Sequence, residues 1–450
     1  MRAIEVGCRP RWVEARDEEW RTFSVRTRAA ATFPRAPVTK PPNRAAPEHR
    51  RPVRILQVIH TLEGTEGPTS VAKGMCAGLT RRGHDVTLMA TGSEVAAPDP
   101  GASGYELRRF PVSLAPLSVS FGMARALRSI QRYDIVHLHM LYRFPQAFAA
   151  YMARRHGVPY CMQPHGCLDP VVYLKPERRT AKRLYEHLFE NRNLGEAAGL
   201  IFTTKGEREA ARSLGLETPS YIVPVGVSVA DYAGTGDGAA FRKQHRLQDK
   251  KLVLWMGRLV PVKRLDLLLS AFASIASNRS DVLLVLAGPD PEGFGREVRQ
   301  LVERAELSHR VLFTGNLSGQ RKHDAFDAAD VFVLPSQTEN FGIVALEALA
   351  TGCPVILSEG VKIWPDVVAA NAGLATRHVV SELSAALQRL LDDGDERRRM
   401  GTAAKEFARR FEWPNVIDRL EDSYGAMIDR ARKGVDDMQR AIDEGPCASL

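Results

Sequence analysis

The sequence contains no apolar run that approaches the roughly 18 residues a membrane-spanning helix needs. Its six cysteines form no CxxC pair and no metal-like spacing with histidine. Free thiols in a reducing compartment are therefore expected, which is typical of a cytoplasmic protein. The N-terminus also lacks the apolar and cleavage-site regions of a secretory signal, so secretion is not expected.

Strong charge patterning is absent as well. The net charge is +9, and residues 1–50 hold +5 of it, from eleven Lys and Arg against six Asp and Glu. No Lys and Arg stripe with interleaved aromatic residues occurs, which argues against a dedicated nucleic-acid binder. Residues 1–51 are rich in Pro, Arg and Ala without periodicity, so they are predicted to form a disordered basic arm.

The rest of the chain is long enough for two domains. Short apolar runs alternate with helical stretches in two series, over 52–226 and 227–412, and a glycine-rich segment separates them. The predicted fold class is α/β, with two doubly wound Rossmann-like domains facing across a cleft. A C-terminal helix over 413–432, able to pack back on the first domain, and a loose tail over 433–450 are expected to follow.

The expected strands of the first series are 54–59, 86–89, 135–138, 160–162, 200–203 and 221–223. Those of the second are 252–256, 282–287, 311–314, 331–334 and 355–357. The first helix is predicted over about 70–82, after a loop that includes Gly67. The backbone N–H groups of this loop can reach a phosphate or an acceptor, although the loop is neither a P-loop nor a GxGxxG motif.

The most informative segment is 335–354, PSQTENFGIVALEALATGCP. Apolar residues recur at helical spacing from Phe341, which predicts a helix that starts near Asn340 to Gly342. The first N–H groups of a helix have no internal partner and carry the positive end of its dipole. Since Gly342 has no side chain to obstruct an anion, this helix tip is predicted to hold a diphosphate.

Two carboxylates flank the predicted helix tip. Glu347 lies about six residues further in, roughly 9 Å along the axis, a distance that suits a ribose diol when the diphosphate sits at the tip. Glu339 lies before the helix, in position to accept hydrogen bonds from hydroxyls of a transferred sugar. The alternative is that Glu339 caps the helix and Glu347 is a solvated surface residue.

Cations are predicted at a neighbouring strand end. Gly257 and Arg258 follow strand 252–256, and Lys263 comes five residues later at the start of the next helix. A guanidinium and an ammonium would neutralise a diphosphate and stabilise it as a leaving group. The alternative is that both are solvated loop cations.

Histidines follow two strands of the first series. His165 comes directly after strand 160–162 and is predicted to reach the cleft, where it would hydrogen-bond the donor sugar or the developing positive ring. His137 or His139 is the alternative cleft histidine, and a lone strand histidine is usually structural. The sequence Asp393-Gly394-Asp395 matches a DxD metal motif, but it follows a helix and is interpreted as a surface turn.

With these residues in place, residues 53–430 resemble the retaining glycosyltransferases of family 4, which have the two-domain GT-B fold. The resemblance rests on the Glu-x7-Glu pattern from Glu339 to Glu347, on GRLVPVKR from Gly257 and on LAGPD from Leu286. It implies transfer of a hexose from a UDP-sugar or GDP-sugar, with retention of configuration and with no metal or other cofactor.

The resemblance also implies individual roles. Glu339 and His165 would contact the donor sugar, Glu347 the ribose, and Arg258 and Lys263 the diphosphate. The remaining residues assigned to donor binding are Asn340, Phe341, Gly342, Gly257 and Gly67.

The pattern Pro-His-Gly-x-Leu-Asp at 164–169, followed by a basic stretch, is similar to transferases that build bacterial cell-surface polysaccharides. A saccharide or lipid-linked saccharide acceptor is therefore expected. In this stretch the cations Arg178, Arg179, Lys182 and Arg183 lie beside the apolar residues Leu184, Leu188 and Phe189. Peripheral contact with anionic lipid on the cytoplasmic face of the inner membrane is therefore expected. The alternative is a solvated helix face. A nucleotide-sugar epimerase of the same fold and a non-catalytic sugar-nucleotide binder remain as rival functions.

Overall fold

The structure is a computed structural model that describes residues 51–63, 66–92, 104–173, 179–232 and 234–443. The predicted arm, apart from Arg51, lies outside the described residues, and so does the end of the chain after Asp443. None of the helices in the described ranges combines the length and the apolar composition needed to span a bilayer.

The first half of the described chain forms a seven-stranded parallel sheet with the order β3-β2-β1-β4-β5-β6-β7. Its strands are β1 (Arg54–Ile59), β2 (Asp85–Thr91), β3 (Glu106–Phe110), β4 (Ile135–His139), β5 (Tyr160–Gln163), β6 (Gly199–Phe202) and β7 (Ser220–Ile222). Its helices are α2 (Glu66–Arg81), α3 (Phe121–Ala126), α4 (Phe144–Arg155), α5 (Pro170–Tyr173), α6 (Arg179–Tyr185), α7 (Asn191–Gly195) and α8 (Lys205–Arg212), with helical turns η1 (Ala115–Leu117), η2 (Leu127–Arg132) and η3 (Glu186–Glu190).

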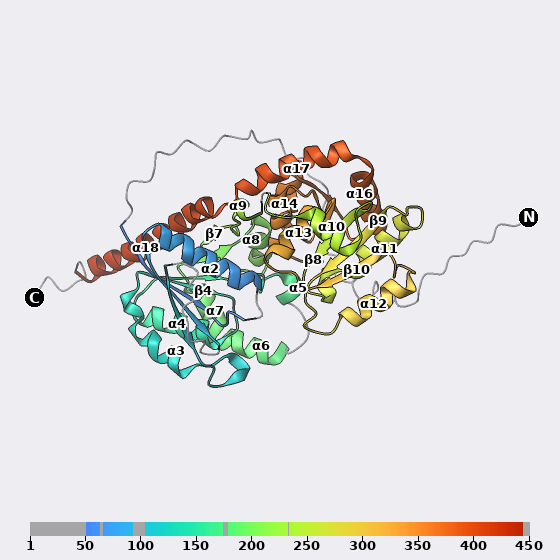
Figure 1. Cartoon of the computed structure of the whole chain (residues 1–450). Helices are drawn as coiled ribbons and strands as arrows, with labels where there is room; N and C mark the ends of the chain where they lie inside the picture. The colour runs from blue at the N-terminus through green and yellow to red at the C-terminus, as the bar shows by residue number, and fades with distance from the viewer. Residues whose placement is uncertain (1–50, 64–65, 93–103, 174–178, 233, 444–450) are drawn as a thin grey trace, which may run out of the picture. The chain divides into compact units, whose positions relative to one another are not determined.

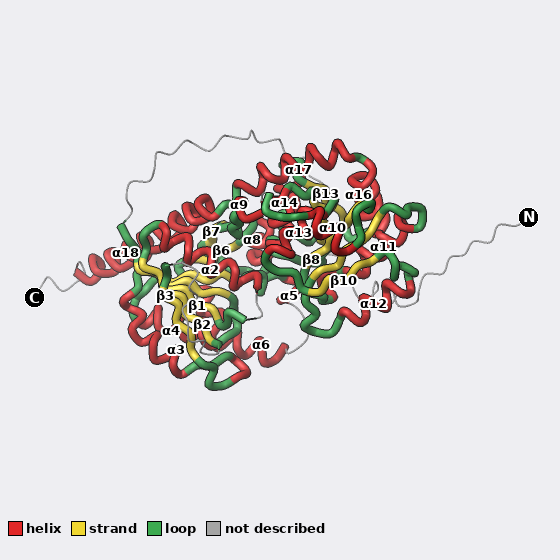
Figure 2. Tube along the Cα trace, viewed as in Figure 1, coloured by secondary structure: helices red, strands yellow, loops and turns green. Residues whose placement is uncertain are grey.

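The second half forms a six-stranded parallel sheet with the order β10-β9-β8-β11-β12-β13, and Figure 2 shows the strands of the two sheets as separate groups. Its strands are β8 (Lys251–Met256), β9 (Val282–Ala287), β10 (Val311–Gly315), β11 (Val331–Leu334), β12 (Val355–Ser358) and β13 (Gly373–Thr376). Its helices are α9 (Val229–Tyr232), α10 (Gly238–His245), α11 (Leu265–Ala276), α12 (Gly295–Arg304), α13 (Gln320–Ala328), α14 (Ile343–Thr351), α15 (Trp364–Ala369), α16 (Val380–Asp392) and α17 (Gly394–Arg409), with the turn η4 (Pro261–Lys263).

Both sheets are buried on their two faces. In β1, Ile55 and Ile59 join one apolar cluster and Leu56 joins another, because successive side chains of a strand point to opposite faces. In β8, Leu254 and Trp255 likewise belong to different clusters. Helices therefore cover both faces, and the predicted α/β fold class with two Rossmann-like sheets is confirmed.

Two strands were absent from the sequence-based prediction, and both lie at the edge of a sheet. In β3 the sequence is ELRRF, and none of its residues is fully buried, so the apolar run that marks a central strand is missing. In β13 the sequence is GLAT, which is short and begins with a glycine. Edge strands need not be apolar on both faces, which explains why hydrophobicity did not reveal them.

Two helix boundaries also differ from the prediction. Helix α2 begins at Glu66 and not near Ser70, so Gly67 lies in its first turn and not in a loop. Helix α18 (Trp413–Asp443) continues beyond the predicted end at Arg432. The residues after Gly434 include good helix formers, and one internal glycine costs only about 1 kcal/mol relative to alanine.

Helix α18 packs against α2, although the two are far apart in the sequence (Figure 1). The Trp413 ring at its start lies directly over Gly74 of α2 and over Gly226. Next to it, the Val227 N–H donates to the carbonyl of Phe411 at 2.8 Å, so the two chain segments that connect the halves run side by side.

Replacing Gly74 with alanine should destabilise the fold, because the new Cβ would lie 1.9 Å from Cζ2 of Trp413. Overpacking of this kind costs about 2 kcal/mol in the free energy of unfolding, which chemical denaturation would measure. The matched control is Gly425→Ala in α18, where no atom lies within 4 Å of the added Cβ. That control should be neutral or stabilising by up to about 1 kcal/mol, and equal effects of the two variants would contradict the packing described.

Candidate functional site

The start of helix α14 is shaped by a glycine that no other residue replaces easily. Gly342 has a φ of 77°, and a Cβ there would lie 3.2 Å from side-chain atoms of both Leu334 and Val361. It is the N-cap residue, so α14 begins at Ile343, next to the predicted start. The preceding Phe341 is buried and packs edge-on against Phe411 at 5.4 Å, which anchors the helix tip to the core.

Glu339 is held in place through its backbone and its side chain. Its N–H donates to the carbonyl of Gly360, and its own carbonyl accepts from the N–H of Lys362, both at 3.0 Å. Its carboxylate forms an ion pair with Lys263. No side chain caps α14, so the alternative in which Glu339 caps the helix is wrong.

Arg258, the other predicted cation, lies on the loop after β8 and differs from Lys263 in having no partner among the described residues. Arg258 is exposed, and it makes no hydrogen bond or ion pair with any residue in the described part of the chain. Next to it, Gly257 lies so close to Gly288 that a Cβ on Gly288 would meet the Gly257 carbonyl oxygen at 1.8 Å. Arg258 thus lies at the surface next to this close approach of two strand ends, while Lys263 is half-buried against Glu339.

Glu347 is buried, so the alternative in which it is a solvated surface residue is wrong. The Tyr232 hydroxyl donates to its Oε1 at 2.7 Å, and the Lys322 ammonium lies 2.6 Å from its Oε2. Burial and the neighbouring carboxylate raise the pKa of Tyr232 above its ordinary value. Sequence reasoning missed Tyr232 and Lys322, because they come from α9 and α13 and share no motif with Glu347.

The loop that carries His165 adopts a strained conformation. His165 has a φ of 50° and Gly166 a φ of 85°, so two successive residues are in the left-handed region. The buried carboxylate of Glu207 holds the loop, because its Oε1 accepts from the Gly166 N–H at 3.1 Å and its Oε2 from the Thr203 N–H at 2.7 Å. Burial raises the pKa of Glu207 above its ordinary value.

The three histidines considered in the sequence form one stacked row. The ring centroids of His137 and His139 are 4.2 Å apart, and those of His139 and His165 are 5.3 Å apart. His137 and His139 are fully buried, whereas His165 is partly exposed. His165 is therefore the member of the row that a ligand can reach.

Loops of the two sheets meet around these residues. A Cβ on Gly166 would lie 2.3 Å from the side-chain amide of Asn340, so these loops are in direct contact. The Thr204 hydroxyl donates to the carbonyl of Asn340 at 3.3 Å. At the start of α2, a Cβ on Gly67 would lie 3.7 Å from Ile343. The loop that carries His165 thus meets the loop that carries Asn340, and the start of α2 with Gly67 meets the start of α14, at the carboxyl ends of the strands.

Asp169 connects the same loops and was not among the predicted site residues. Its Oδ2 accepts a hydrogen bond from the Thr338 hydroxyl at 2.8 Å and lies 3.5 Å from the ammonium of Lys362. The sequence signal was present, since Asp169 closes the Pro-His-Gly-x-Leu-Asp pattern.

The DxD sequence is not part of this site. Asp393 is the N-cap of α17, and its side chain accepts from the Glu396 N–H at 2.8 Å, as expected for a surface turn. Across the ranges that the structure describes, no three His, Cys, Asp or Glu side chains converge as a metal site would require.

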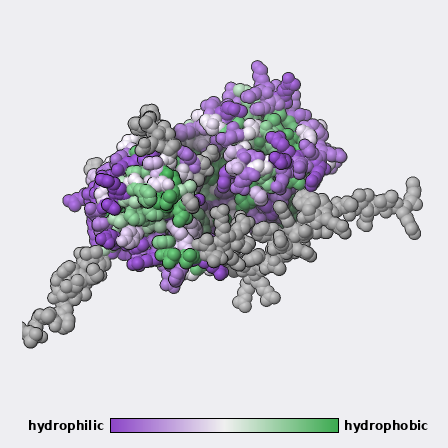
Figure 3. All heavy atoms as spheres, turned by 90° about the horizontal axis from the view of Figure 1, so that it is seen from below, coloured by the Kyte–Doolittle hydropathy of each residue, from purple (hydrophilic) through white to green (hydrophobic). Residues whose placement is uncertain are grey.

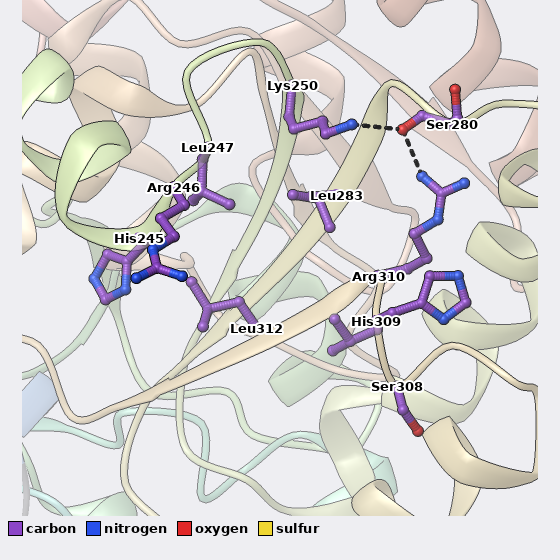
Figure 4. Close-up of a pocket in the computed structure, with 11 residues that line it drawn as sticks. His245, Arg246, Leu247, Lys250, Ser280, Leu283, Ser308, His309, Arg310 and Leu312 are labelled. Carbon is purple, nitrogen blue, oxygen red and sulfur yellow. Dashed lines mark hydrogen bonds between the residues drawn. The ribbon is translucent and has the colours of Figure 1, made fainter.

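The sheet of the second half has a pocket at each end of its strands. The pocket in Figure 4 is lined by His245, Lys250 and Arg310, near the amino ends of β8, β9 and β10, so it lies at the opposite edge of the sheet from Glu339. A second pocket, of about 490 Å³, lies at the carboxyl ends of β9 and β10. Its lining includes Leu259, directly after Arg258, and Arg299, whose guanidinium lies 4.1 Å from the ring centroid of Phe313.

Comparison with known proteins agrees with this architecture. Residues 237–407 match the sequence model of the glycosyl transferases group 1, and residues 66–226 match that of the glycosyl transferase 4-like domain. The chain is similar to D-inositol 3-phosphate glycosyltransferases of Stackebrandtia nassauensis (29% identity, 74% of this chain and 77% of the relative) and Nocardia farcinica (28% identity, 84% and 90%).

Solved structures share the fold. Sucrose-phosphate synthase from Thermosynechococcus elongatus superimposes with a TM-score of 0.68 at 21% identity, over 84% of this chain and all of that one. HepE from Anabaena, solved in complex with UDP-glucose, gives a TM-score of 0.69 at 17% identity, over 83% and all of that chain. The fold is that of the GT-B glycosyltransferases. The chain belongs to the group 1 glycosyltransferases, the family 4 enzymes that its motifs resemble.

Burial shapes the protonation of the histidine row. Burial lowers the pKa of His137 and of His165 to about 3, from an ordinary value of 6.5. Burial and the two neighbouring rings lower the pKa of His139 well below its ordinary value. All three imidazoles are therefore neutral near pH 7.

These lowered pKa values predict acid sensitivity. Between a folded pKa of about 3 and an unfolded value of 6.5, the unfolded state binds more protons than the folded state, so stability falls as pH drops below 6.5. His137 alone should account for about 2 kcal/mol of the unfolding free energy lost between pH 7 and pH 5.

Denaturant titrations at pH 7 and pH 5 would measure the unfolding free energy that the wild type and His137→Phe each lose between these pH values. The loss should be smaller in His137→Phe by about 2 kcal/mol. Leu138→Val, a buried neighbour without a titratable group, is the control and should keep the wild-type pH dependence. An unchanged pH dependence in His137→Phe would refute the assignment.

Proposed function

We propose that this glycosyltransferase transfers a hexose, with retention of configuration, from a UDP-sugar or GDP-sugar to a saccharide or lipid-linked saccharide. The observation that carries the proposal is the ion pair between Lys263 and Glu339 directly before the tip of α14. It puts a cation for a phosphate and an acid for sugar hydroxyls side by side, at the place where the loops of both sheets meet.

The diphosphate is assigned to the tip of α14. Its first backbone N–H groups and the positive end of its dipole favour an anion, and Gly342 leaves the approach open. Arg258 has its guanidinium donors free of partners among the described residues, so it can form charge-assisted bonds to the phosphates. Together with Lys263 it would stabilise the negative charge that grows on the leaving diphosphate, and no metal is needed in this scheme.

The two ends of the donor are assigned to different groups. Glu339 and His165 would contact the transferred sugar, and Gly67 would lie near the phosphates. Glu347 would accept the ribose hydroxyls, with Tyr232 and Lys322 orienting its carboxylate. The pocket that contains Arg299 and Phe313 has room for a nucleobase.

A second candidate acceptor comes from the relatives. Those described above are named D-inositol 3-phosphate glycosyltransferases, so a phosphorylated cyclitol is the alternative to a saccharide. The pattern Pro-His-Gly-x-Leu-Asp at 164–169 favours a saccharide acceptor for bacterial cell-surface polysaccharide, including exopolysaccharide. Both acceptors present hydroxyl nucleophiles, so the donor chemistry is the same.

A lipid surface is the proposed location of the acceptor. Leu184, Leu188 and Phe189 are each about half exposed, and Val171 and Val172 of α5, which precede them in the sequence, are exposed as well. A second group of exposed apolar side chains lies at Leu114, Leu117 and Phe121. Figure 3, seen from the side on which α3 and α6 lie in Figure 1, shows apolar residues gathered over the first half of the chain.

The cations proposed for this surface are only partly available. Arg183 is exposed, and so are Arg125 and Arg128 near the second apolar group, which suits anionic headgroups. Lys182 does not face the surface, since its ammonium donates to the Tyr173 carbonyl at 2.7 Å and lies over the Tyr173 ring. Arg178 and the side chain of Arg179 lie outside the described residues.

Incubation with UDP-sugars and GDP-sugars should release the nucleoside diphosphate faster when a saccharide, a lipid-linked saccharide or an inositol phosphate is added. Glu339→Ala and Arg258→Ala should each lower kcat/KM for the donor by roughly 100-fold, because each removes a charged contact to the donor or its leaving group.

Glu406→Ala and Arg398→Ala, two exposed charges of α17, are the matched controls and should transfer at wild-type rates. An epimerised donor with its diphosphate still attached would establish the epimerase instead, and binding without turnover would establish the non-catalytic binder. Wild-type rates in both site variants would remove these residues from the mechanism.

Membrane contact predicts that the double variant Leu184→Ser/Leu188→Ser sediments with phosphatidylglycerol vesicles at least about tenfold more weakly than the wild type, because two apolar side chains no longer enter the interface. Val379→Ser/Val380→Ser, on an exposed apolar pair of the second half, is the matched control. Equal binding of the two double variants would exclude this surface.

A further inference from the structure

A buried polar chain leads from the interior of the first sheet to His165. Nε2 of His139 lies 2.9 Å from Oε1 of Gln57, and Nδ1 of His139 lies 3.1 Å from Nε2 of His165. Gln57 and His139 are fully buried and come from the adjacent strands β1 and β4, while His165 follows β5. Three neighbouring strands thus contribute one residue each to a line of hydrogen bonds.

The direction of these bonds follows from the first acceptor. A side-chain carbonyl oxygen can only accept, so the contact with Gln57 requires the hydrogen of His139 to be on Nε2. A neutral imidazole carries one hydrogen, so Nδ1 of His139 has a lone pair and can only accept. The hydrogen in the second bond must therefore come from Nε2 of His165.

We infer that Gln57 and His139 are positioning residues that fix His165 in the tautomer with its hydrogen on Nε2 and its lone pair on Nδ1. No residue in the described part of the chain bonds to this Nδ1. A neutral nitrogen with a lone pair accepts a hydrogen bond from a hydroxyl and offers nothing to a carboxylate. The site is thus built for a sugar with a hydroxyl group at this position, not for one with a charged acid group there.

The residues around this line of hydrogen bonds keep its histidines neutral and fixed in position. The titratable groups acting on His139 are the stacked rings of His137 and His165. His137 is itself held by a hydrogen bond, because its Nδ1 lies 2.7 Å from the hydroxyl of Tyr424 in α18. Gln146 adds a further constraint, because its amide donates to the carbonyl of His139 at 2.6 Å.

The strained backbone of His165 is consistent with this role. A φ of 50° at a residue other than glycine persists when surrounding contacts over-determine the conformation. Here the bond to His139 holds the side chain, and the Gly166 N–H bond to Glu207 holds the backbone. The imidazole is thereby prevented from turning its Nε2–H outward.

The first test reads the tautomer directly. In the full-length protein with ¹⁵N-labelled histidine, long-range ¹H–¹⁵N spectra should show His165 as the neutral form with hydrogen on Nε2, assigned by loss of its signals in His165→Ala. The form should persist from pH 5.5 to pH 8. Hydrogen on Nδ1, or a protonated ring, at neutral pH would overturn the inference.

The second test rests on the proposed function and uses two isosteric variants. In His139→Asn the amide oxygen replaces Nδ1 and still accepts from His165, whereas in His139→Gln the amide replaces Nε2 and satisfies only Gln57. Kcat/KM for the donor should fall roughly tenfold in His139→Gln and clearly less in His139→Asn, at similar melting temperatures.

Equal losses in the two variants, or no loss in either, would refute the positioning role. A wild-type protein that transfers no sugar would refute the proposed function alone, because the tautomer measurement does not depend on activity. A carboxylate-bearing UDP-uronic acid used as well as the neutral UDP-hexose would refute the inferred preference for a hydroxyl group.

Discussion

The buried carboxylate of Asp169 is the interaction on which the rest of the site depends. Asp169 lies on the loop after β5 of the first sheet, and its carboxylate accepts a hydrogen bond from Thr338 on the loop after β11 of the second sheet. Lys362, on the loop after β12, lies 3.5 Å from the same oxygen. Burying a carboxylate is costly unless it is paired and hydrogen-bonded, so Asp169 needs both partners. The one carboxylate therefore links these three loops. Gly166 and Asn340, which are in direct contact, lie on the first two of these loops.

The site combines fixed backbone with charged side chains from separate strand ends. Gly342 and Gly166 lie in the left-handed region, and a Cβ would lie 3.2 Å from side-chain atoms at Gly342 and 2.3 Å from the Asn340 amide at Gly166. Around them lie the exposed cation Arg258 and the ion pair of Lys263 with Glu339. Rigid glycine-based turns with charged groups at their edges suit a ligand whose charge changes during reaction, because little reorganisation is needed.

Much of the fold was predictable because hydrophobic periodicity reports burial over short distances. Central strands such as Val331–Leu334 are apolar on both faces, and their limits agree with the prediction. The strands that were missed, Glu106–Phe110 and Gly373–Thr376, are edge strands without that pattern. Among the cations expected to face lipid, the prediction for Lys182 was wrong, since the sequence cannot show that its ammonium turns inward onto Tyr173.

The sequence by itself determined the helix tip at Gly342, the acids around it and the two α/β halves, because helix signals and strand runs act over a few neighbouring residues. Tertiary structure alone decided the partners: Lys263 with Glu339, Tyr232 and Lys322 with Glu347, and Gln57 with His139. Tyr232 and Glu347 are 115 residues apart, and Gln57 and His139 are 82 apart. Such pairs form only once the order of strands in each sheet brings their ends together, and no local pattern encodes that order.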